Sequence, residues 1–310
     1  MPKLQLSLSC TGYDRVRPLF DGRVQIEGVD LIPSAIEPEE GFHRAFKFGE
    51  FDIAELSISS HTLTVSRGEN DYVGLPVMVS RVFRQSGFYI RTDRGIRSPQ
   101  DLRGKKIGLR GYQITANTWM RGILQDEYGV RPEEIHWRRG GIEEPGQGEH
   151  AVLRLPPGIE LQDIPADRTL SGMLESGELD GVINPRAPSC FLRGAPHVAR
   201  LFQDYRAEEE GYFRRTGIFP IMHIIGIRKS LVEKHPWLPV NVYKGFLAAK
   251  QIAEKELNEI GHLMVALPWL IHEFNATRAL MGEDYWPYGF AENRKVLDAF
   301  TRYHFEQGLS

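Results

Sequence analysis

The sequence has few cysteines and no long hydrophobic run. Cys10 and Cys190 are the only cysteines in 310 residues, too few for a disulfide framework and without metal-ligand spacing. No run approaches the roughly 18 apolar residues of a membrane-spanning helix, and the amino-terminal stretch lacks the apolar core of a secretory leader. We therefore expect a cytoplasmic protein with no membrane partner.

An excess of charge of one sign is also missing. The 38 Lys and Arg residues nearly balance the 41 Asp and Glu residues, which gives a formal net charge of −3. Proteins that bind nucleic acid by neutralising phosphates are usually strongly basic, so no nucleic-acid partner is expected. With 41% hydrophobic and 25% charged residues, the composition is that of a globular protein, and the length indicates two domains.

Local catalytic motifs are absent as well. The sequence has no glycine-rich nucleotide loop, no serine nucleophile elbow and no HExxH-type metal spacing. His43, His61 and Glu55 are the nearest approach to a metal-ligand set, but they are scattered along the chain. No metal site is therefore expected from local spacing, and a site formed by residues far apart in the sequence stays an open alternative.

The first sixty residues follow the order strand, helix, strand. Residues 4–8 alternate apolar and polar, 29–36 form a second expected strand, a helix opens at Pro38, and 51–54 form a third strand. This order is typical of a mainly parallel α/β sheet, in which ligands bind beyond the carboxyl ends of the strands. Residues 55–60 are therefore expected to lie at a site.

The rest of the chain predicts a second domain inserted into the first. Strands are expected at 73–79, 106–109, 179–183 and 221–227, helices at 116–128 and near the carboxyl terminus, and a long surface loop at 140–157. Residues 87–91 and 221–227 are expected to carry the chain between domains. We predict a first domain of residues 1–90 and 219–310, a second of 91–218, and a ligand cleft between them.

Several segments resemble known proteins. Residues 95–108, GIRSPQDLRGKKIG, resemble the entry to the second lobe of type II periplasmic binding proteins. More specific segments are ELSISS (55–60), SRVFR (80–84), YQITA (112–116), RGILQDEYGV (121–130), RRTGIFPIMH (214–223) and MGEDYWPYG (281–289). Together they resemble the 4,5-dihydroxyphthalate decarboxylase family from the first strand to the last helix.

This resemblance implies both a fold and an activity. The fold is α/β, with two lobes of the type II periplasmic-binding-protein-like kind, mixed but mainly parallel sheets and a discontinuous first domain. The activity is cofactor-independent decarboxylation of a small aromatic carboxylate, 4,5-dihydroxyphthalate, to protocatechuate and CO2. A cytoplasmic location and a homo-oligomer are implied too.

That reaction needs an acid over the ring, a base near a hydroxyl and a clamp for the carboxylate that stays. His223 follows residues 219–222 of the expected hinge and is the first candidate for proton transfer, because imidazole exchanges protons near neutral pH. Glu55 is a candidate partner acid or base, with a pKa that burial would raise. A hinge histidine that only makes a hydrogen bond, and an ion pair of Glu55 with an arginine, fit the same positions.

Candidate substrate ligands lie next to expected strand ends and helix starts. Arg81 and Arg84 are three residues apart, so on a helical turn they would face the same way. Arginine forks, serine hydroxyls and the amides of a helix start all suit carboxylates. The candidates are Arg81, Arg84, Ser57, Ser59, Ser60, Tyr112, Gln113, Thr115, Arg186 and Arg215. A solvated surface, a serine turn and capping by Thr115 are the structural alternatives.

Two other functions fit the same fold. One is a cytoplasmic small-anion-binding protein, similar to solute-binding proteins, that performs no catalysis. The other is a biosynthetic enzyme of the thiamin-pyrimidine or menaquinone branches. Thiamin-pyrimidine synthases carry a CCCFC motif, and this sequence has nothing like it.

Overall fold

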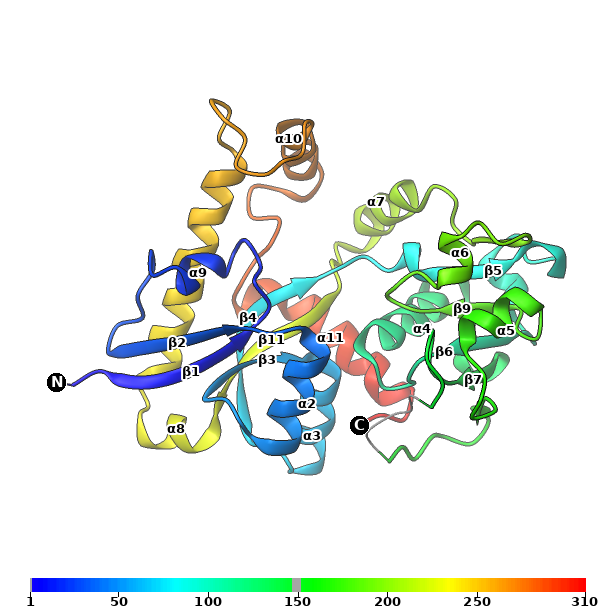
Figure 1. Ribbon diagram of the computed structural model, residues 1–310, viewed down its shortest axis with the longest axis horizontal. Helices are drawn as coiled ribbons and strands as arrows, with labels where there is room; N and C mark the ends of the chain where they lie inside the picture. The colour runs from blue at the N-terminus through cyan, green and yellow to red at the C-terminus, as the bar shows by residue number, and fades with distance from the viewer. Residues whose placement is uncertain (1, 147–151) are drawn as a thin grey trace. The chain divides into compact units, whose positions relative to one another are not determined.

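The computed structural model describes residues 2–146 and 152–310, in two compact units. The first unit comprises Met1–Arg81 and Ile221–Lys295, and the second comprises Val82–Pro220 and Val296–Ser310 (Figure 1). Among the helices of the described residues, none has the length and apolar character needed to cross a bilayer.

The first unit is built on a five-stranded sheet with the order β2-β1-β3-β11-β4. Its strands are β1 (Leu4–Cys10), β2 (Val29–Ala35), β3 (Ile53–Ser57), β4 (Tyr72–Arg81) and β11 (Ile221–Arg228). β1 is parallel to β2 and β3, whereas β11 runs antiparallel between β3 and β4. The sheet therefore combines parallel βαβ units with one central strand that arrives from far along the chain.

Helices cover the sheet of the first unit (Figure 1). They are α1 (Arg17–Phe20), α2 (Pro38–Phe48), α3 (Ile58–Arg67), α8 (Lys229–Lys234) and α9 (Leu238–Leu257), whereas α10 (Leu270–Met281) packs against α9. Val242, Phe246, Ala249 and Ala253 recur at helical spacing on α9 and are all buried, so this face of α9 packs into the core.

The second unit is built on a six-stranded sheet with the order β10-β5-β9-β6-β7-β8. Its strands are β5 (Phe88–Arg91), β6 (Lys106–Leu109), β7 (His136–Arg139), β8 (Leu161–Asp163), β9 (Gly181–Ile183) and β10 (Val198–Arg200). Its helices are α4 (Thr115–Tyr128), α5 (Leu170–Ser176), α6 (Ser189–Leu192) and α7 (Tyr205–Thr216), together with the second half of α11 (Phe290–Glu306). Short 3-10 turns occur at Gln85–Gly87, Thr92–Arg94, Pro99–Leu102 and Pro132–Glu134.

Most predicted strands are confirmed, but the boundaries between the units differ from those predicted. Residues 88–91 form β5, which pairs with β9 and β10 inside the second sheet instead of crossing between domains. Residues 296–310 belong to the second unit, because Phe300 and Tyr303 pack against Trp119 of α4 there. The units divide at 81/82, 220/221 and 295/296.

The third predicted strand ends later than the sequence indicates. β3 runs to Ser57 and α3 begins at Ile58, so Glu55 lies within a strand and Ser59 and Ser60 lie in the first turn of a helix. The predicted loop 140–157 is only partly described, since residues 147–151 lie outside the described residues. Helix α7 and strands β7, β8 and β10 were not predicted.

Candidate functional site

A carboxylate and an imidazole meet in the middle of the first sheet. The Nδ1 atom of His223, on β11, lies 2.6 Å from Oε1 of Glu55, on β3. The Glu55 side chain is 3% exposed and that of His223 is 18% exposed, so the pair has one buried and one more accessible end. The Phe42 ring of α2 meets the imidazole edge to face, with the ring centroids 4.8 Å apart.

The register of the strands brings these two side chains together. In the antiparallel β3–β11 pair, His223 is opposite Ser57 and Ile225 is opposite Glu55. Glu55 and His223 are therefore diagonal neighbours on the same face, a distance that long side chains span. On its other side His223 is opposite Ser80 of β4, and the register shifts on both sides of this position. Such irregularities redirect a side chain and are common next to active sites.

Glu55 is held by several hydrogen-bond donors. The Tyr13 hydroxyl donates to Oε1 at 2.8 Å, and the Thr11 amide donates to Oε2 at 2.8 Å. Burial alone would raise the pKa of Glu55, but the hydrogen bond and charge of His223, with the Thr11 and Tyr13 donors, lower it to about 2. The expected rise in the pKa of Glu55 is thus wrong, because the donors outweigh burial.

An ionised Glu55 determines which nitrogen of His223 carries the proton. A carboxylate only accepts hydrogen bonds, so the His223 Nδ1 must donate to it. The Nε2 atom is then the nitrogen available for proton transfer. Glu55 is therefore suited to orient and charge-stabilise the imidazole, rather than to donate a proton itself.

Tyr13 and Arg15 also belong to this site, although neither is among the predicted site residues. The Arg15 guanidinium lies between two rings, 4.2 Å from the Tyr13 centroid and 4.1 Å from the Trp286 centroid. Both residues follow the carboxyl end of β1. Position after a parallel strand was the only signal in the sequence that pointed to them.

An irregular stretch of β4 supplies the acceptors that hold this cluster. The Val79 carbonyl accepts from Arg15 Nε at 2.7 Å, and the Met78 carbonyl accepts from Trp286 Nε1 at 2.7 Å. Pro76 lies in the same stretch, where the pairing register between β4 and β11 shifts. Because the ladder is interrupted there, these carbonyls find side-chain partners instead.

Arg81 is buried at the end of β4. Its guanidinium donates to the Pro287 carbonyl at 3.0 Å and to the Asn293 amide oxygen. Burial lowers the pKa of Arg81 to about 10. These contacts fix the 284–288 loop that carries Trp286, and the role of Arg81 as a substrate ligand stays a prediction.

A second buried cation, Lys250 of α9, holds the same loop. Its ammonium group donates to the Trp286 carbonyl at 2.8 Å and pairs with Asp284 at the loop's start. The 284–288 loop is thus fixed to the core from two sides, by Arg81 and by Lys250.

The three candidate serines surround the junction of β3 and α3. The Ser57 hydroxyl caps α3 by accepting a hydrogen bond from the Ser60 amide at 3.3 Å. Ser59 is fully buried and Ser60 is half-buried. Ser57 is opposite His223 in the sheet, so it is the candidate serine that the register places beside the imidazole.

The candidates at the start of α4 belong to the second unit. The Tyr112 side chain is fully buried, with the Arg121 guanidinium 3.7 Å above its ring. Thr115 is the first residue of α4 and Ile114 is the N-cap, without a side-chain capping bond, so capping by Thr115 is wrong. Gln113 is half-buried. Substrate binding by these residues stays a prediction.

The remaining candidate arginines also lie in the second unit. Arg84 precedes the 3-10 turn Gln85–Gly87, so it shares neither a helical turn nor a unit with Arg81, contrary to expectation. Burial lowers the pKa of Arg84 to about 10. Arg186 is exposed, and Arg215 binds the Glu127 carboxylate at 2.8 Å. None of these contacts tests their predicted role.

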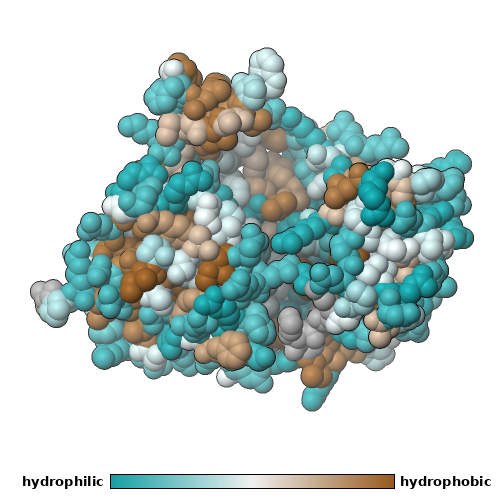
Figure 2. All heavy atoms as spheres, in the orientation of Figure 1, coloured by the Kyte–Doolittle hydropathy of each residue, from teal (hydrophilic) through white to brown (hydrophobic). Residues whose placement is uncertain are grey.

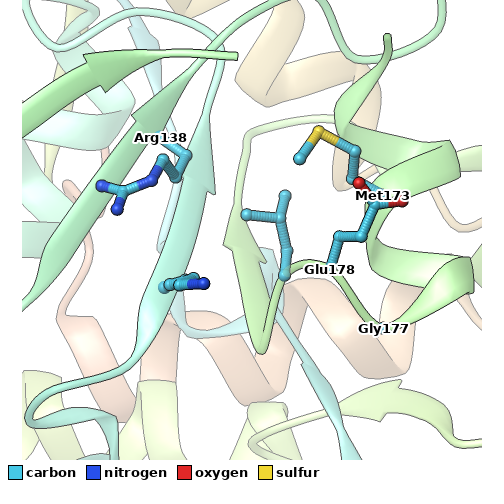
Figure 3. Close-up of a pocket in the computed structure, with 6 residues that line it drawn as sticks. Arg138, Met173, Gly177 and Glu178 are labelled. Carbon is cyan, nitrogen blue, oxygen red and sulfur yellow. The ribbon is translucent and has the colours of Figure 1, made fainter. Parts of the chain in front are cut away.

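The described residues hold no cluster of metal-ligating side chains, and a pocket of the second unit contains none of the predicted site residues. Within residues 2–146 and 152–310, no group of three or more His, Cys, Asp or Glu could hold a metal ion. Figure 3 shows a shallow pocket of the second unit, beside the start of β6. It is lined by Lys106, Arg138, Met173, Gly177, Glu178 and Leu179. None of the predicted site residues lines it.

Comparison with solved structures identifies the fold. A protein of Archaeoglobus fulgidus matches with a TM-score of 0.53 and 12% identity, over 99% of this chain and 98% of that one. The alkanesulfonate-binding protein SsuA from Xanthomonas axonopodis pv. citri, bound to MOPS, matches with a TM-score of 0.52 and 12% identity, over 100% and 96%. The chain has the two-lobed periplasmic-binding-protein-like fold that the sequence predicts.

Comparison of sequences identifies the family. A family model described as "NMT1/THI5 like" matches residues 51–143. The 4,5-dihydroxyphthalate decarboxylase of Pseudomonas putida is 48% identical over 214 residues, 69% of this chain and 83% of that protein. The decarboxylase of the same name from Comamonas testosteroni is 48% identical over 310 residues, 100% of this chain and 94% of that protein. The chain therefore belongs to the 4,5-dihydroxyphthalate decarboxylase family.

Proposed function

We propose that the protein converts 4,5-dihydroxyphthalate to protocatechuate and CO2 without an organic cofactor. The observation that carries this proposal is the 48% identity to a curated decarboxylase of that name along the whole chain. The Glu55–His223 pair fits the chemistry of this reaction, because the reaction needs a positioned proton donor.

The proposed reaction begins with proton transfer to the ring. His223, protonated on both nitrogens, donates the Nε2 proton to the ring carbon that bears the leaving carboxylate. Loss of the proton from the hydroxyl para to that carbon lets oxygen supply electrons, and a dienone forms. The bond to the carboxylate then breaks, its electrons restore the aromatic ring, and CO2 leaves. The hydroxyl and His223 regain protons from solvent, so the net reaction consumes one proton.

Glu55 contributes by orienting the imidazole. An ionised carboxylate 2.6 Å from Nδ1 accepts a hydrogen bond from it and fixes the direction of the ring. Tyr13 and Thr11 in turn keep Glu55 ionised and in place. We therefore assign Tyr13 the role of a positioning residue.

Substrate binding is proposed to distinguish the two carboxylates. A cation should hold the carboxylate that stays, whereas tight binding of the leaving one would stabilise the ground state and slow the reaction. The Arg15 guanidinium lies 4.2 Å from the centroid of the Tyr13 ring, and its stacking between two rings fixes its direction. We add Arg15 to the predicted substrate ligands.

Incubation of the purified protein with 4,5-dihydroxyphthalate tests the function. Chromatography should show protocatechuate, with one CO2 released for each substrate consumed, in the presence of a metal chelator. Unchanged substrate, with a folded protein and with divalent metals also tried, would contradict the proposal. Unchanged substrate that nevertheless binds the protein would favour the small-anion-binding alternative.

We further propose a cytoplasmic location and assembly into a homo-oligomer. Both are supported by what the family resemblance implies. Cell fractionation with an antibody against the protein, and light scattering of the purified protein, test the two statements separately.

A further inference from the structure

The segment between α9 and α10 exposes an unusual number of large apolar side chains. Figure 2 shows them as a hydrophobic cap over the part of the chain that precedes α10. Trp269 is 74% exposed and Ile260 is 78% exposed. The side chains of this cap, which we call the 260–269 patch, are Ile260, Leu263, Met264, Val265, Leu267 and Trp269.

Backbone hydrogen bonds within the segment form local turns that carry the patch. The Leu267 amide donates to the Val265 carbonyl at 2.7 Å, and the Leu270 amide donates to the Leu267 carbonyl at 3.0 Å. The apolar residues that follow the patch are buried instead of exposed. Leu270 and Phe274 are both buried, and the Phe274 ring packs edge to face against the Tyr285 ring. Thus α10 is anchored to the first unit, while the segment before it presents its apolar side chains outward.

The size of the patch suits a stable protein interface. The six side chains are 42% to 78% exposed, and the largest apolar patch of a protein surface is often an interaction site. A standard interface takes roughly 800 Å² from each partner, with tryptophan a frequent centre of the binding energy.

The charge around the patch favours a protein partner over a membrane. Residues 256–277 contain no Lys or Arg, and their charged side chains are three glutamates. Segments that bind anionic lipid surfaces carry basic residues beside the apolar ones. An apolar centre with little charge is instead self-complementary, because two copies can meet around a twofold axis without repulsion at the centre.

We propose that the 260–269 patch is the contact through which two copies of this chain associate, with Trp269 at its centre. This inference extends the assembly proposed above and does not depend on the substrate. It gives a local, apolar and isologous interface in the first unit.

Light scattering over a concentration series tests the proposal. The Met264→Lys/Trp269→Lys double variant places positive charges on both sides of the twofold axis. We expect the full-length variant to self-associate at least about 30-fold more weakly than the unsubstituted protein, the effect of losing a central tryptophan. The matched control is Leu192→Lys/Phe305→Lys, whose side chains are 70% and 71% exposed and lie outside the patch. This control should associate normally.

Each possible result either supports or overturns the proposed interface. An unsubstituted protein that stays monomeric overturns both the assembly and the interface. An oligomer that the patch variant leaves intact overturns the interface alone, and so does equal weakening by both double variants. Circular dichroism must show the same thermal transition for all three proteins. If the patch variant fails to fold, the single Trp269→Ser variant replaces it in the same comparison.

Discussion

The Glu55 carboxylate accepts hydrogen bonds from His223, Tyr13 and Thr11. Three donors around one buried carboxylate hold its charge and fix its direction. The Glu55 carboxylate, held in a fixed direction, then orients the His223 imidazole. At the scale of single residues, His223 and Glu55 therefore have different roles: His223 is the proposed proton donor, and Glu55 orients it.

Replacing His223 tests its role in proton transfer. We expect His223→Gln to lower kcat/KM by about 10²- to 10⁴-fold, the usual contribution of a general acid, while the fold is retained. Steady-state assays of protocatechuate formation provide the measurement. His136→Gln serves as the control, since His136 lies in the second unit beside Glu160. Near-normal kcat/KM in His223→Gln would remove this residue from the mechanism.

The lowered pKa of Glu55 predicts a loss of stability in acid. Its pKa is about 2 in the folded protein, against 4.5 ordinarily, so its contribution is complete above about pH 4.5 and disappears as the pH falls towards 2. The shift corresponds to roughly 3 kcal/mol in the free energy of unfolding. Denaturant titrations at several pH values should show a smaller decline for Glu55→Gln.

The control for this experiment is Glu27→Gln, which changes an exposed carboxyl of the same unit. It should follow the unsubstituted protein. Equal pH dependence in Glu55→Gln and the unsubstituted protein would show that Glu55 is not held in its ionised form.

At the scale of elements, α4 and the second half of α11 pack through a glycine. A Cβ atom at Gly122 would overlap the ring of Tyr303. That close approach lets the Tyr303 hydroxyl reach Asp126 of α4 at 2.5 Å. The absence of a side chain at Gly122 therefore makes room for the Tyr303 ring between the two helices.

Gly122→Ala is expected to destabilise the protein by about 1–3 kcal/mol, the usual cost of overpacking. Thermal or denaturant unfolding measures the change. Gly211→Ala in α7 is the matched control, because the nearest atom to its Cβ is the mobile end of Arg215 at 3.1 Å. Alanine favours helix there, so this variant should be neutral or more stable by up to about 1 kcal/mol. Similar destabilisation of both variants would contradict the packing argument.

At the scale of the whole molecule, the end of the chain completes the second unit. Arg121 is fully buried and donates to Gln307 at 2.8 Å, and Gln307 donates to the Thr118 carbonyl at 3.0 Å. Residues 296–310 therefore satisfy a buried cation as well as covering Trp119.

Deleting residues 296–310 should loosen the second unit selectively. We expect amide hydrogen exchange to accelerate across β6 and α4 (106–128), while β1 and β3 of the first unit keep their protection. The full-length Phe305→Ala variant, which changes a 71% exposed side chain, is the control and should exchange normally. If protection across 106–128 were unchanged, residues 296–310 would belong to the first unit, as predicted from the sequence.

Local patterns in the sequence were sufficient to predict the order of strands and helices around the site, and the family. Alternation in residues 4–8 and the apolar run 221–227 predict strands because these patterns depend on local burial alone. The segments quoted for the family lie along the whole chain, and the 48% identity to a curated decarboxylase confirms that assignment. An expected strand end selected Glu55 and the expected hinge selected His223, although both residues lie within strands in the structure.

The interactions between those candidates depend on contacts between distant parts of the chain. The 2.6 Å contact of Glu55 with His223 depends on the register of strands that are 168 residues apart, which no local pattern encodes. The sign of the pKa shift of Glu55 depends on donors from the loop after β1, and Arg15 is fixed by carbonyls that an irregular β4 releases. Which domain receives the last helix was equally non-local, because an amphipathic pattern records that a face is buried but not against what.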